Sequence, residues 1–473
     1  MRTLLARIRE SRFGQATLIL SLGAVLPQAI NILFYPLLTR LYSPSEFGTF
    51  ATISSLIFIL GTVVSWRYEL AIPLAKDRET GVILLMVSLA ATVLTVLAVS
   101  VCLWVGNKLN WLSLLHPDFA TYAWVVPFAL LGTGYAQSLT YGALWLKQFG
   151  LITRMRLIQS LGQGLIQVVG GILGIGALGL LLGFVLAKYL GLLPLLRVLP
   201  ISRRDFIPRR WVEAAFRYRD FPLYNTWAAL VDAVGNQLPV ILIAKFFSAA
   251  DAGQFSLAVR VLALPSLLIG QGLSQAFYSW AAEFADRPEL LRKRMEKLSG
   301  VLLISSLGLF GVVAVVAPFM FSWLFGDAWS LAGHYTRYLT PWLLLNFVSS
   351  PLSTIVLVKQ KQKWAFFFTI YEAFLRLLGV WLGYLGSSAA LSVFLFGLAG
   401  AFISAVYLLW ELYLVGVDLR QWFSRLWFYL ATGGFGVLLM IYLEPVLPPA
   451  FLGAASVVIL GGFSFWALVR WLR

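Results

Sequence analysis

Residues 81–105 read GVILLMVSLAATVLTVLAVSVCLWV, a stretch without a single charged side chain. About 20 apolar residues cross a bilayer as a helix, and this stretch lacks the polar–apolar alternation of a barrel strand. The whole chain has the same character: 60% of its 473 residues are hydrophobic, 12% are charged, and the mean hydropathy is +0.85. So few charges do not cover the surface of a soluble protein of this size. We therefore predict an all-α integral membrane protein, which excludes the soluble enzyme classes.

The same reasoning predicts about fourteen membrane-spanning helices, with short connections and no extramembrane domain. The predicted spans are 16–39, 49–72, 81–105, 119–146, 155–175, 178–199, 222–244, 253–280, 299–323, 333–357, 364–385, 390–413, 426–443 and 450–469. The first apolar run is longer than the core of a cleavable signal peptide, so none is expected.

The net charge of +16 falls mainly on one side of the predicted membrane. With the N-terminus inside, 28 of the 36 Lys and Arg residues lie in cytoplasmic segments. Cytoplasmic loops of membrane proteins carry such an excess, so both termini are predicted to be cytoplasmic. The basic charge therefore needs no nucleic-acid partner. Residues 1–13 are basic and apolar, and either lie on the inner leaflet or form a disordered tail.

Two parts of the chain are similar in sequence: residues 31–50 read NILFYPLLTRLYSPSEFGTF, and residues 236–255 read NQLPVILIAKFFSAADAGQF. The matches include Arg40 with Lys245, Ser43 with Ser248, Glu46 with Asp251 and Gly48 with Gly253. A second similarity joins LKQ at 146–148 to VKQ at 358–360. Because the matches recur at equivalent places in the topology, we predict two like-oriented copies of a six-helix unit.

The predicted organisation follows from this duplication. It consists of a basic cytoplasmic segment at 1–15, an N-lobe at 16–199, a basic cytoplasmic linker at 200–221, a C-lobe at 222–413 and two further helices at 414–473.

The segment LYSPSEFGTF at 41–50, preceded by Arg40 and followed by RYELAIPLAKD at 67–77, resembles the start of bacterial polysaccharide flippases. These O-antigen, capsule and exopolysaccharide translocases belong to the multidrug/oligosaccharidyl-lipid/polysaccharide (MOP) exporter superfamily. The resemblance implies a V-shaped pair of six-helix lobes around a central cavity in the bacterial cytoplasmic (inner) membrane. It also implies alternating-access transport of undecaprenyl-diphosphate-linked oligosaccharide from the inner to the outer leaflet. Membrane lipids, a glycan polymerase and chain-length proteins are the partners expected.

A second segment, AVRVLALP at 258–265, is similar to one in the peptidoglycan-precursor flippase, and this similarity implies that Arg260 faces the cavity. The first helix of that flippase carries an adjacent Arg-Asp pair. The first span predicted here has only Gln28, Asn31 and the terminal Arg40. This difference argues against the peptidoglycan precursor as the substrate.

Ionisable residues inside the predicted spans, and the basic residues Arg40, Lys245 and Arg337 at their outer edges, are candidates for contact with such a substrate. A charge at mid-depth costs about 2.5–3.5 kcal/mol on insertion scales, so it is expected to face a cavity or a partner. Arg also offers a forked donor geometry that suits phosphate. The predicted ligands of the diphosphate and glycan are Arg260, Lys188, Arg40, Lys245, Arg67 and Arg337. The residues predicted either to couple an ion or to form structural pairs are Asp232, Glu69, Glu372 and Arg376.

Packing offers an alternative role for most of these residues. Glu372 and Arg376 are four residues apart on one helix and can pair locally. Asp232 and Arg260 can form a buried pair between consecutive helices. Arg67, near a span end, can extend to the headgroups.

Other functions have signatures that this sequence lacks. No G-x4-G-K-[ST] occurs, so no P-loop ATPase is expected. His116 and His334 are far apart and Cys102 is the one cysteine, so no metal site, cofactor or internal disulfide is expected. A multidrug or cation antiporter of the same superfamily would favour buried acids over this surplus of cations. A glycan polymerase would need a larger outer loop than residues 106–118, so the chain is predicted not to be an enzyme.

Overall fold

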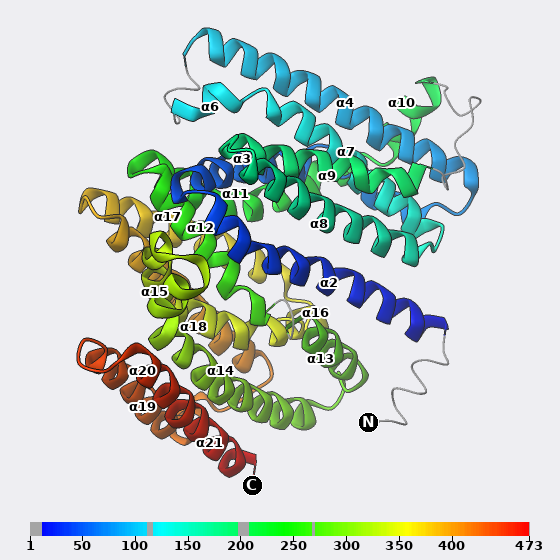
Figure 1. Cartoon of the computed structure of the whole chain (residues 1–473). Coiled ribbons are helices and arrows are strands. Elements are labelled where there is room, and N and C mark those ends of the chain that lie inside the picture. Colours follow the sequence, from blue (N-terminus) through cyan, green and yellow to red (C-terminus); the bar gives the residue numbers. More distant parts are fainter. Residues whose placement is uncertain (1–11, 111–116, 197–207, 267–269, 473) are drawn as a thin grey trace. The chain divides into compact units, whose positions relative to one another are not determined.

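The computed structural model describes residues 12–110, 117–196, 208–266 and 270–472, and within these ranges the protein is helical without a strand (Figure 1). The all-α prediction is therefore confirmed. The chain forms two compact units, unit 1 up to Gly253 and unit 2 from Gln254. Most of the predicted segment 1–15 lies outside the described residues. The division into two six-helix lobes and a terminal pair stays a prediction.

Among the described residues, unit 1 contains nine complete α-helices and the two short helices η1 and η3. In chain order these are α2 (Arg12–Leu41), α3 (Pro44–Val63), η1 (Tyr68–Leu74), α4 (Arg78–Lys108), α6 (Pro117–Tyr122), α7 (Val125–Trp145), α8 (Phe149–Ile172), α9 (Ala177–Leu196), α10 (Pro208–Arg217), η3 (Phe221–Asn225) and α11 (Thr226–Phe246).

The boundary between the units falls within α12 (Ala249–Leu262). Unit 2 continues with α13 (Gln271–Glu283), α14 (Pro288–Phe325), η5 (Asp327–Trp329), α15 (Ser330–Leu352), α16 (Ile355–Val358), α17 (Gln362–Leu385), α18 (Ala389–Leu414), α19 (Leu419–Leu443), α20 (Pro449–Ser456), η6 (Val457–Gly461) and α21 (Gly462–Leu472).

Within the described residues, ten helices are long and apolar enough to cross a membrane. The other four predicted spans fall on α2, on α7, on α8 and on α12 with α13. The count of about fourteen spans therefore stays a prediction.

The second predicted span, 49–72, is not a single helix. α3 ends at Val63, and Trp66 and Arg67 take φ values of +54° and +61° in the left-handed region. A right-handed helix does not continue through two such residues, so the chain restarts as η1. The hydropathy pattern misses this break because the sequence on both sides of it stays apolar.

The described part of the predicted linker 200–221 contains the amphipathic helix α10, which packs against α4 in unit 1. Its Trp211 and Ala215 pack against a small apolar cluster that contains Tyr68 and Val87. The Tyr68 hydroxyl also donates to the Ala215 carbonyl at 3.1 Å. This part of the linker is therefore a docked helix, which the charge pattern alone did not reveal.

The two similar segments begin their helices in the same way. At the start of α3, the backbone N–H of Glu46 donates to the Ser43 hydroxyl at 3.3 Å, and the Glu46 carboxylate accepts from Ser43. At the start of α12, the Asp251 N–H donates to the Ser248 hydroxyl at 3.0 Å, and the Asp251 carboxylate accepts from that hydroxyl at 2.6 Å. Such serine–acid caps satisfy the free N–H groups of a helix start.

The matched glycines of these segments lie against each other within unit 1. A Cβ on Gly48 would overlap the carbonyl oxygen of Ala249, and a Cβ on Gly253 would overlap that of Pro44. Each glycine therefore packs against the first residue of the other helix: Gly48 faces Ala249 of α12, and Gly253 faces Pro44 of α3. Duplicated segments related by a local two-fold axis would make such a reciprocal contact, and the duplication itself stays a prediction.

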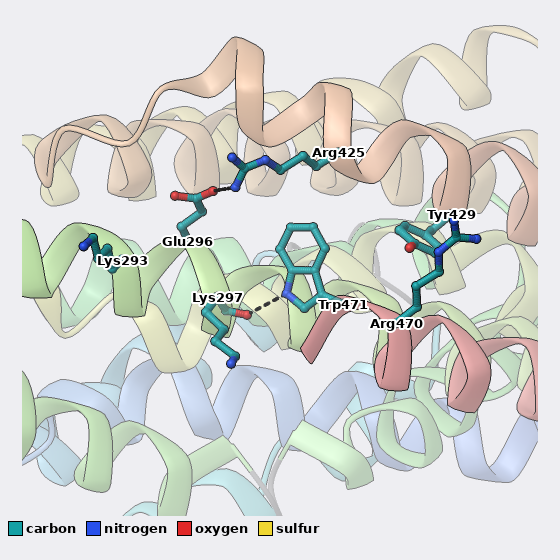
Figure 2. Close-up of a pocket in the computed structure, with 7 residues that line it drawn as sticks. All are labelled: Lys293, Glu296, Lys297, Arg425, Tyr429, Arg470 and Trp471. Carbon is teal, nitrogen blue, oxygen red and sulfur yellow. Dashed lines mark hydrogen bonds and ion pairs between the residues drawn. The ribbon is translucent and has the colours of Figure 1, made fainter. Parts of the chain in front are cut away.

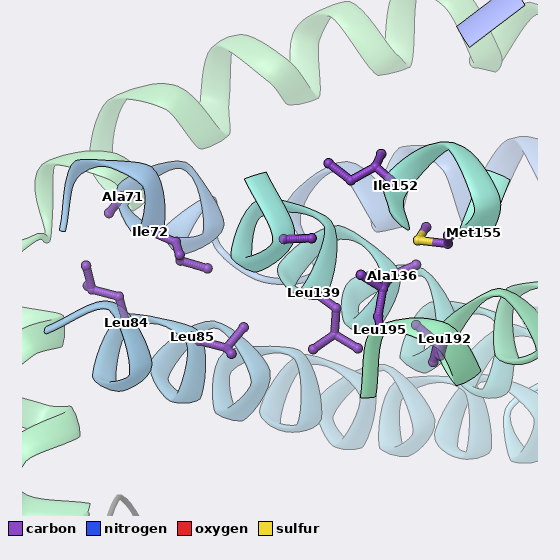
Figure 3. Close-up of a cluster of buried hydrophobic side chains, with 11 residues drawn as sticks. Ala71, Ile72, Leu84, Leu85, Ala136, Leu139, Ile152, Met155, Leu192 and Leu195 are labelled. Carbon is purple, nitrogen blue, oxygen red and sulfur yellow. The ribbon is translucent and has the colours of Figure 1, made fainter. Parts of the chain in front are cut away.

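A buried apolar cluster holds η1 against the helices of unit 1 (Figure 3). Its members include Ile72 from η1, Leu85 from α4, Leu139 from α7, Ile152 from α8 and Leu195 from α9. Because η1 follows the break at Arg67, this cluster fixes the position of the polar residues at that break. Helices in a bilayer associate through such close packing, because lipid is as apolar as the side chains and gives no hydrophobic driving force.

Candidate functional site

A cavity of about 350 Å³ lies within unit 1 between α3, α7, α8 and α9. Its lining includes Ala136 and Met155, which also belong to the apolar cluster of Figure 3. The lining side chains that carry a charge or an amide are Gln137 on α7, Arg156 and Gln159 on α8, and Lys188 on α9. We refer to this space as the unit 1 cavity.

The unit 1 cavity is electropositive. Arg156 and Lys188 are its cations, and its described lining includes no carboxylate. Lys188 is half-buried, and its Nζ lies 5.1 Å from the centroid of the Phe184 ring. The aromatic face attracts the ammonium group and positions it without neutralising its charge. The cavity therefore favours an anion.

Three buried polar atoms of this lining have no hydrogen-bond partner among the described residues: Thr133 Oγ1, Gln137 Oε1 and Gln159 Nε2. The Gln137 amide is oriented by its Nε2, which donates to the Gly61 carbonyl at 3.1 Å. Gln137 therefore offers an acceptor, whereas Gln159 offers a donor. Because buried polar groups are normally paired, these atoms indicate a place for a hydroxylated ligand or for water.

Arg67 and Glu69 lie at the break between α3 and η1. Glu69 is 1% exposed; its carboxylate accepts from the Ser65 hydroxyl at 2.6 Å and lies 3.7 Å from Arg67. Tyr141, which lines the unit 1 cavity, lies within electrostatic range of Arg67, Glu69 and Arg156. Two of the predicted ligands, Arg67 and the lining residue Lys188, are thus placed at or beside one cavity.

A second polar cavity, of about 210 Å³, lies within unit 2 between α15, α17 and α18. Its lining includes Glu372, which forms an ion pair with Arg376 at 3.0 Å along α17. The Arg376 guanidinium carbon lies 4.1 Å from the ring centroid of Trp342 and 4.4 Å from that of Phe396. Arg376 is buried and held by one acid and two aromatic rings, which is the environment of a structural residue.

Glu411 on α18 lies next to this unit 2 cavity and is fully buried. Ser349, which lines the cavity, donates to Glu411 Oε2 at 3.1 Å. Glu411 Oε1 has no hydrogen-bond partner among the described residues. A bare charge at this depth is costly, so such a carboxylate is expected to hold a proton or a cation.

The two cavities occupy equivalent places in the predicted repeat, in which α7, α8 and α9 correspond to α15, α17 and α18. Their electrostatics differ. The unit 1 cavity has two lining cations and no lining carboxylate, whereas the unit 2 cavity has Glu372 in its lining and Glu411 beside it. The structure thus places an anion-attracting cavity in unit 1 and an acid-bearing cavity in unit 2.

Of the six predicted ligands, Lys188 alone is among the described lining residues of these two cavities. Arg40 and Lys245 are exposed in the last turns of α2 and α11. Arg337 donates from Nε to the Ala314 carbonyl at 2.9 Å and pairs with Glu444 at 2.7 Å. Arg337 therefore joins the packed helices of unit 2, and these contacts describe a structural anchor.

Asp232 and Arg260 lie in different units, on α11 and on α12 beyond the boundary. Asp232 is exposed and accepts from Asn236 Nδ2 at 3.2 Å. Arg260 is half-buried, and its Nε donates to Ser256 Oγ at 3.2 Å. A buried pair between Asp232 and Arg260 stays a prediction.

The sequence prediction omits several residues of the unit 1 cavity. It considers only ionisable groups as ligands, so it does not include the amide side chains of Gln137 and Gln159. Arg156 lies at the start of the predicted span 155–175, and the charge count places it among the 28 cytoplasmic cations. Uncharged polar residues within apolar helices are the signal that finds them, because hydrocarbon does not solvate an amide.

Comparison with known proteins was made for both sequence and fold. Residues 37–333, more than half of the chain, match a family described as polysaccharide biosynthesis protein. The lipopolysaccharide biosynthesis protein WzxC of Escherichia coli strain K12 is 25% identical over 217 residues, which are 45% of this chain and 44% of that protein. The chain therefore aligns with less than half of the length of this relative.

Solved transporter structures share the fold, among them a flippase and a multidrug transporter. The lipid II flippase MurJ, in an inward closed conformation, matches with a TM-score of 0.72 and 11% identity, over 96% of this chain and 98% of that chain. An inward-facing multidrug resistance MATE family transporter of the MOP superfamily matches with a TM-score of 0.63 and 15% identity, over 84% of this chain and 98% of that chain. At these identities the likeness concerns the fold alone.

Proposed function

We propose, from the premise that the chain belongs to the polysaccharide biosynthesis protein family, that it translocates an undecaprenyl-diphosphate-linked oligosaccharide across a bilayer. The protein is a multi-pass membrane transporter with the MOP-superfamily fold, not an enzyme. In the proposal, the cargo moves from the inner to the outer leaflet of the bacterial cytoplasmic membrane, and both termini are cytoplasmic. A glycan polymerase and chain-length proteins would act on the cargo after its release, during O-antigen, capsule or exopolysaccharide assembly.

The observation that carries this proposal is the composition of the unit 1 cavity. Lys188 and Arg156 supply positive charge for a diphosphate, and no carboxylate of the described lining opposes it. Gln137 Oε1 and Gln159 Nε2 offer an acceptor and a donor that lack partners among the described residues, as the hydroxyl groups of a sugar require. A cavity for a lipophilic cation would need the opposite charge.

The size of the unit 1 cavity limits what it can hold. Its volume of about 350 Å³ lies near the lower end of the ~300–1,000 Å³ range of small-molecule pockets. We expect it to hold the diphosphate and the sugar next to it, not a whole oligosaccharide. Arg67, Arg260, Arg40 and Lys245 are proposed to contact the cargo elsewhere along its path.

Transport by alternating access needs a step that resets the protein. We assign this step to the unit 2 cavity, where Glu411 and Glu372 are placed to take up a proton or a cation. Asp232 and Glu69 are further candidates for ion coupling. Glu372 is already paired with Arg376 and Glu69 with Arg67, whereas Asp232 is exposed. Glu411 is therefore the buried candidate that keeps a carboxylate oxygen without a partner among the described residues.

The second candidate function is a multidrug or cation antiporter, and the acids of the unit 2 cavity are the observation that favours it. The two functions differ in which cavity binds the cargo. An antiporter would lose transport on loss of Glu411 or Glu372 and keep it on loss of Lys188. A lipid-linked glycan flippase would lose cargo binding on loss of Lys188 and keep it on loss of Glu411 or Glu372.

The experiment uses a strain that lacks the gene and any redundant exporter, complemented with variants at equal expression. We expect Lys188→Gln and Arg156→Gln each to reduce glycan export about tenfold or more, because a hydrogen bond to a charged group contributes about 1.5–3 kcal/mol. Lipid-linked intermediates should then accumulate in the inner leaflet. The matched control is Arg154→Gln, two residues away on α8 and exposed, which should export normally. Normal glycan export in the deletion strain itself would refute the function.

A further inference from the structure

A basic cavity of about 520 Å³ lies within unit 2 where the ends of α14, α19 and α21 meet (Figure 2). Its cations are Lys293 and Lys297 from α14, Arg425 from α19 and Arg470 from α21. One lining carboxylate, Glu296, accompanies these four cations. Neither the transport proposal nor the predicted ligands involve this cavity.

Tryptophan side chains hold the three helix ends together. Trp422 of α19 donates from Nε1 to Ser299 Oγ at 3.0 Å, and Trp471 of α21 donates from Nε1 to the Lys297 carbonyl at 3.2 Å. A Cβ on Gly300 would overlap the Trp471 indole, so the absence of a side chain there lets α21 approach α14. The arrangement of the cations is therefore built by packing and hydrogen bonds, as Figure 2 shows for Trp471.

The charges of the cavity are not balanced by its own acid. Glu296 forms an ion pair with Arg425 at 2.7 Å, which accounts for one cation (Figure 2). Arg470 lies over the Trp466 ring, 5.4 Å from its centroid, and Lys293 is exposed. A group with more than one negative charge would complete this lining, because a single charge would leave the cavity positive.

The surroundings of the cavity indicate that this group belongs to a lipid. The membrane-spanning window of α19 is 22% buried in the protein, and that of the helix from Pro449 to Trp471 is 28% buried. Most of both helices is therefore open to acyl chains, with Phe428 and Phe465 among the exposed residues. The cations stand at the ends of these apolar helices, on the side that the charge distribution predicts to be cytoplasmic. Basic pockets between transmembrane helices at this depth bind phospholipid headgroups.

We propose that this basic cavity binds the two-phosphate headgroup of an anionic phospholipid from the surrounding inner leaflet. The lipid joins the ends of α14 and α21 by bridging Lys293 and Arg470 across the cavity. This inference does not depend on the transported cargo, because it concerns a resident lipid in unit 2.

The test measures lipid retained by the purified full-length protein from vesicles that contain phosphatidylcholine with 10% cardiolipin, by native mass spectrometry. The variant carries Lys293→Gln with Arg470→Gln, which leaves the Arg425–Glu296 pair intact. Each cation near a membrane surface contributes a factor of about five, so we expect retention to fall about 25-fold. The matched control, Lys361→Gln with Lys363→Gln, removes two exposed cations of the same unit and should retain cardiolipin as the wild type does.

Three further measurements separate the effect of charge from misfolding and identify the ligand. The charge-conserving variant Lys293→Arg with Arg470→Lys should keep retention within about threefold, which separates a charge effect from misfolding. Phosphatidylglycerol at equal total charge should be retained at least fivefold less than cardiolipin, and inorganic pyrophosphate should not displace it. Equal retention by the Gln variant, equal retention of phosphatidylglycerol, or displacement by pyrophosphate would each overturn the assignment.

Discussion

Gln137 and Gln159 are uncharged, yet they provide polar atoms of the unit 1 cavity that a ligand could bind. Their amides extend from α7 and α8 into one cavity, and each leaves one polar atom without a partner among the described residues. A buried polar group without a partner costs about 1–3 kcal/mol, so retaining two of them opposes stability. A binding role explains why they are there, because a sugar hydroxyl can satisfy both an acceptor and a donor.

Replacing Gln159 with Leu tests this role. The substitution removes an unsatisfied donor and keeps a similar volume, so the free energy of unfolding should stay within about 1 kcal/mol of the wild-type value. Glycan export should fall about tenfold, since a hydrogen bond to the cargo is lost. Thermal unfolding of the purified protein and export in the complemented strain measure the two effects. Gln163→Leu, one turn along α8 and outside the cavity lining, should change neither; equal loss in both variants would contradict a binding role.

Sequence could identify some of these residues but not their relation. Lys188 is recognisable as a lone charge in an apolar helix, and it does line the unit 1 cavity. Arg337 has the same sequence signature, yet it pairs with Glu444, more than 100 residues away. No local pattern tells these cases apart, because the partner comes from another helix.

At the scale of helices and their joints, the repeated segments contain the most predictable contacts. The serine–acid caps at Ser43 and Ser248 follow directly from the aligned sequences. The break at Trp66 and Arg67 cannot be predicted in this way. Glycine is the usual sign of a left-handed backbone, and neither residue is a glycine. Helix α10 was likewise absent from the prediction, since charge counting describes a loop's side of the membrane and not its conformation.

The glycine contact between α3 and α12 gives a prediction at this scale. A Cβ at either Gly48 or Gly253 would overlap backbone of the other segment, which cannot move aside as a side chain can. Gly48→Ala and Gly253→Ala should each destabilise the protein by about 1–3 kcal/mol, the usual cost of overpacking. Because both act on one contact, the double variant should cost less than the sum of the two.

The measurement is thermal unfolding of the purified variants, compared with Gly150→Ala at a glycine that has open space around its Cβ position. Gly150→Ala should be neutral or slightly stabilising, since alanine favours a helix. Full additivity of the Gly48 and Gly253 effects would show that the two glycines do not share a contact.

For the molecule as a whole, the difference between the two polar cavities is what duplication alone does not predict. Two copies of one unit would begin with equal cavities, but here the unit 1 cavity is lined by cations and the unit 2 cavity by an acid. The repeat can be inferred from aligned residues, whereas this electrostatic difference depends on which residues of several separate helices meet. It suggests a division of labour, with cargo binding in unit 1 and ion coupling in unit 2.

Glu411→Gln tests this division. The amide keeps an acceptor for the Ser349 hydroxyl, which now donates at 3.1 Å, so the fold should persist. The variant cannot take up a proton or bind a cation through a charge, so transport driven by an imposed proton or sodium gradient should fall to the level seen without a gradient. Binding of the lipid-linked glycan should stay within about threefold, whereas Lys188→Gln should weaken binding tenfold or more. Reconstituted proteoliposomes with and without a gradient measure the first effect, and Glu289→Gln, an exposed acid of the same unit, serves as the control. If Glu411→Gln transports with full gradient dependence, coupling lies elsewhere, and the acids of the unit 2 cavity serve only to hold its helices together.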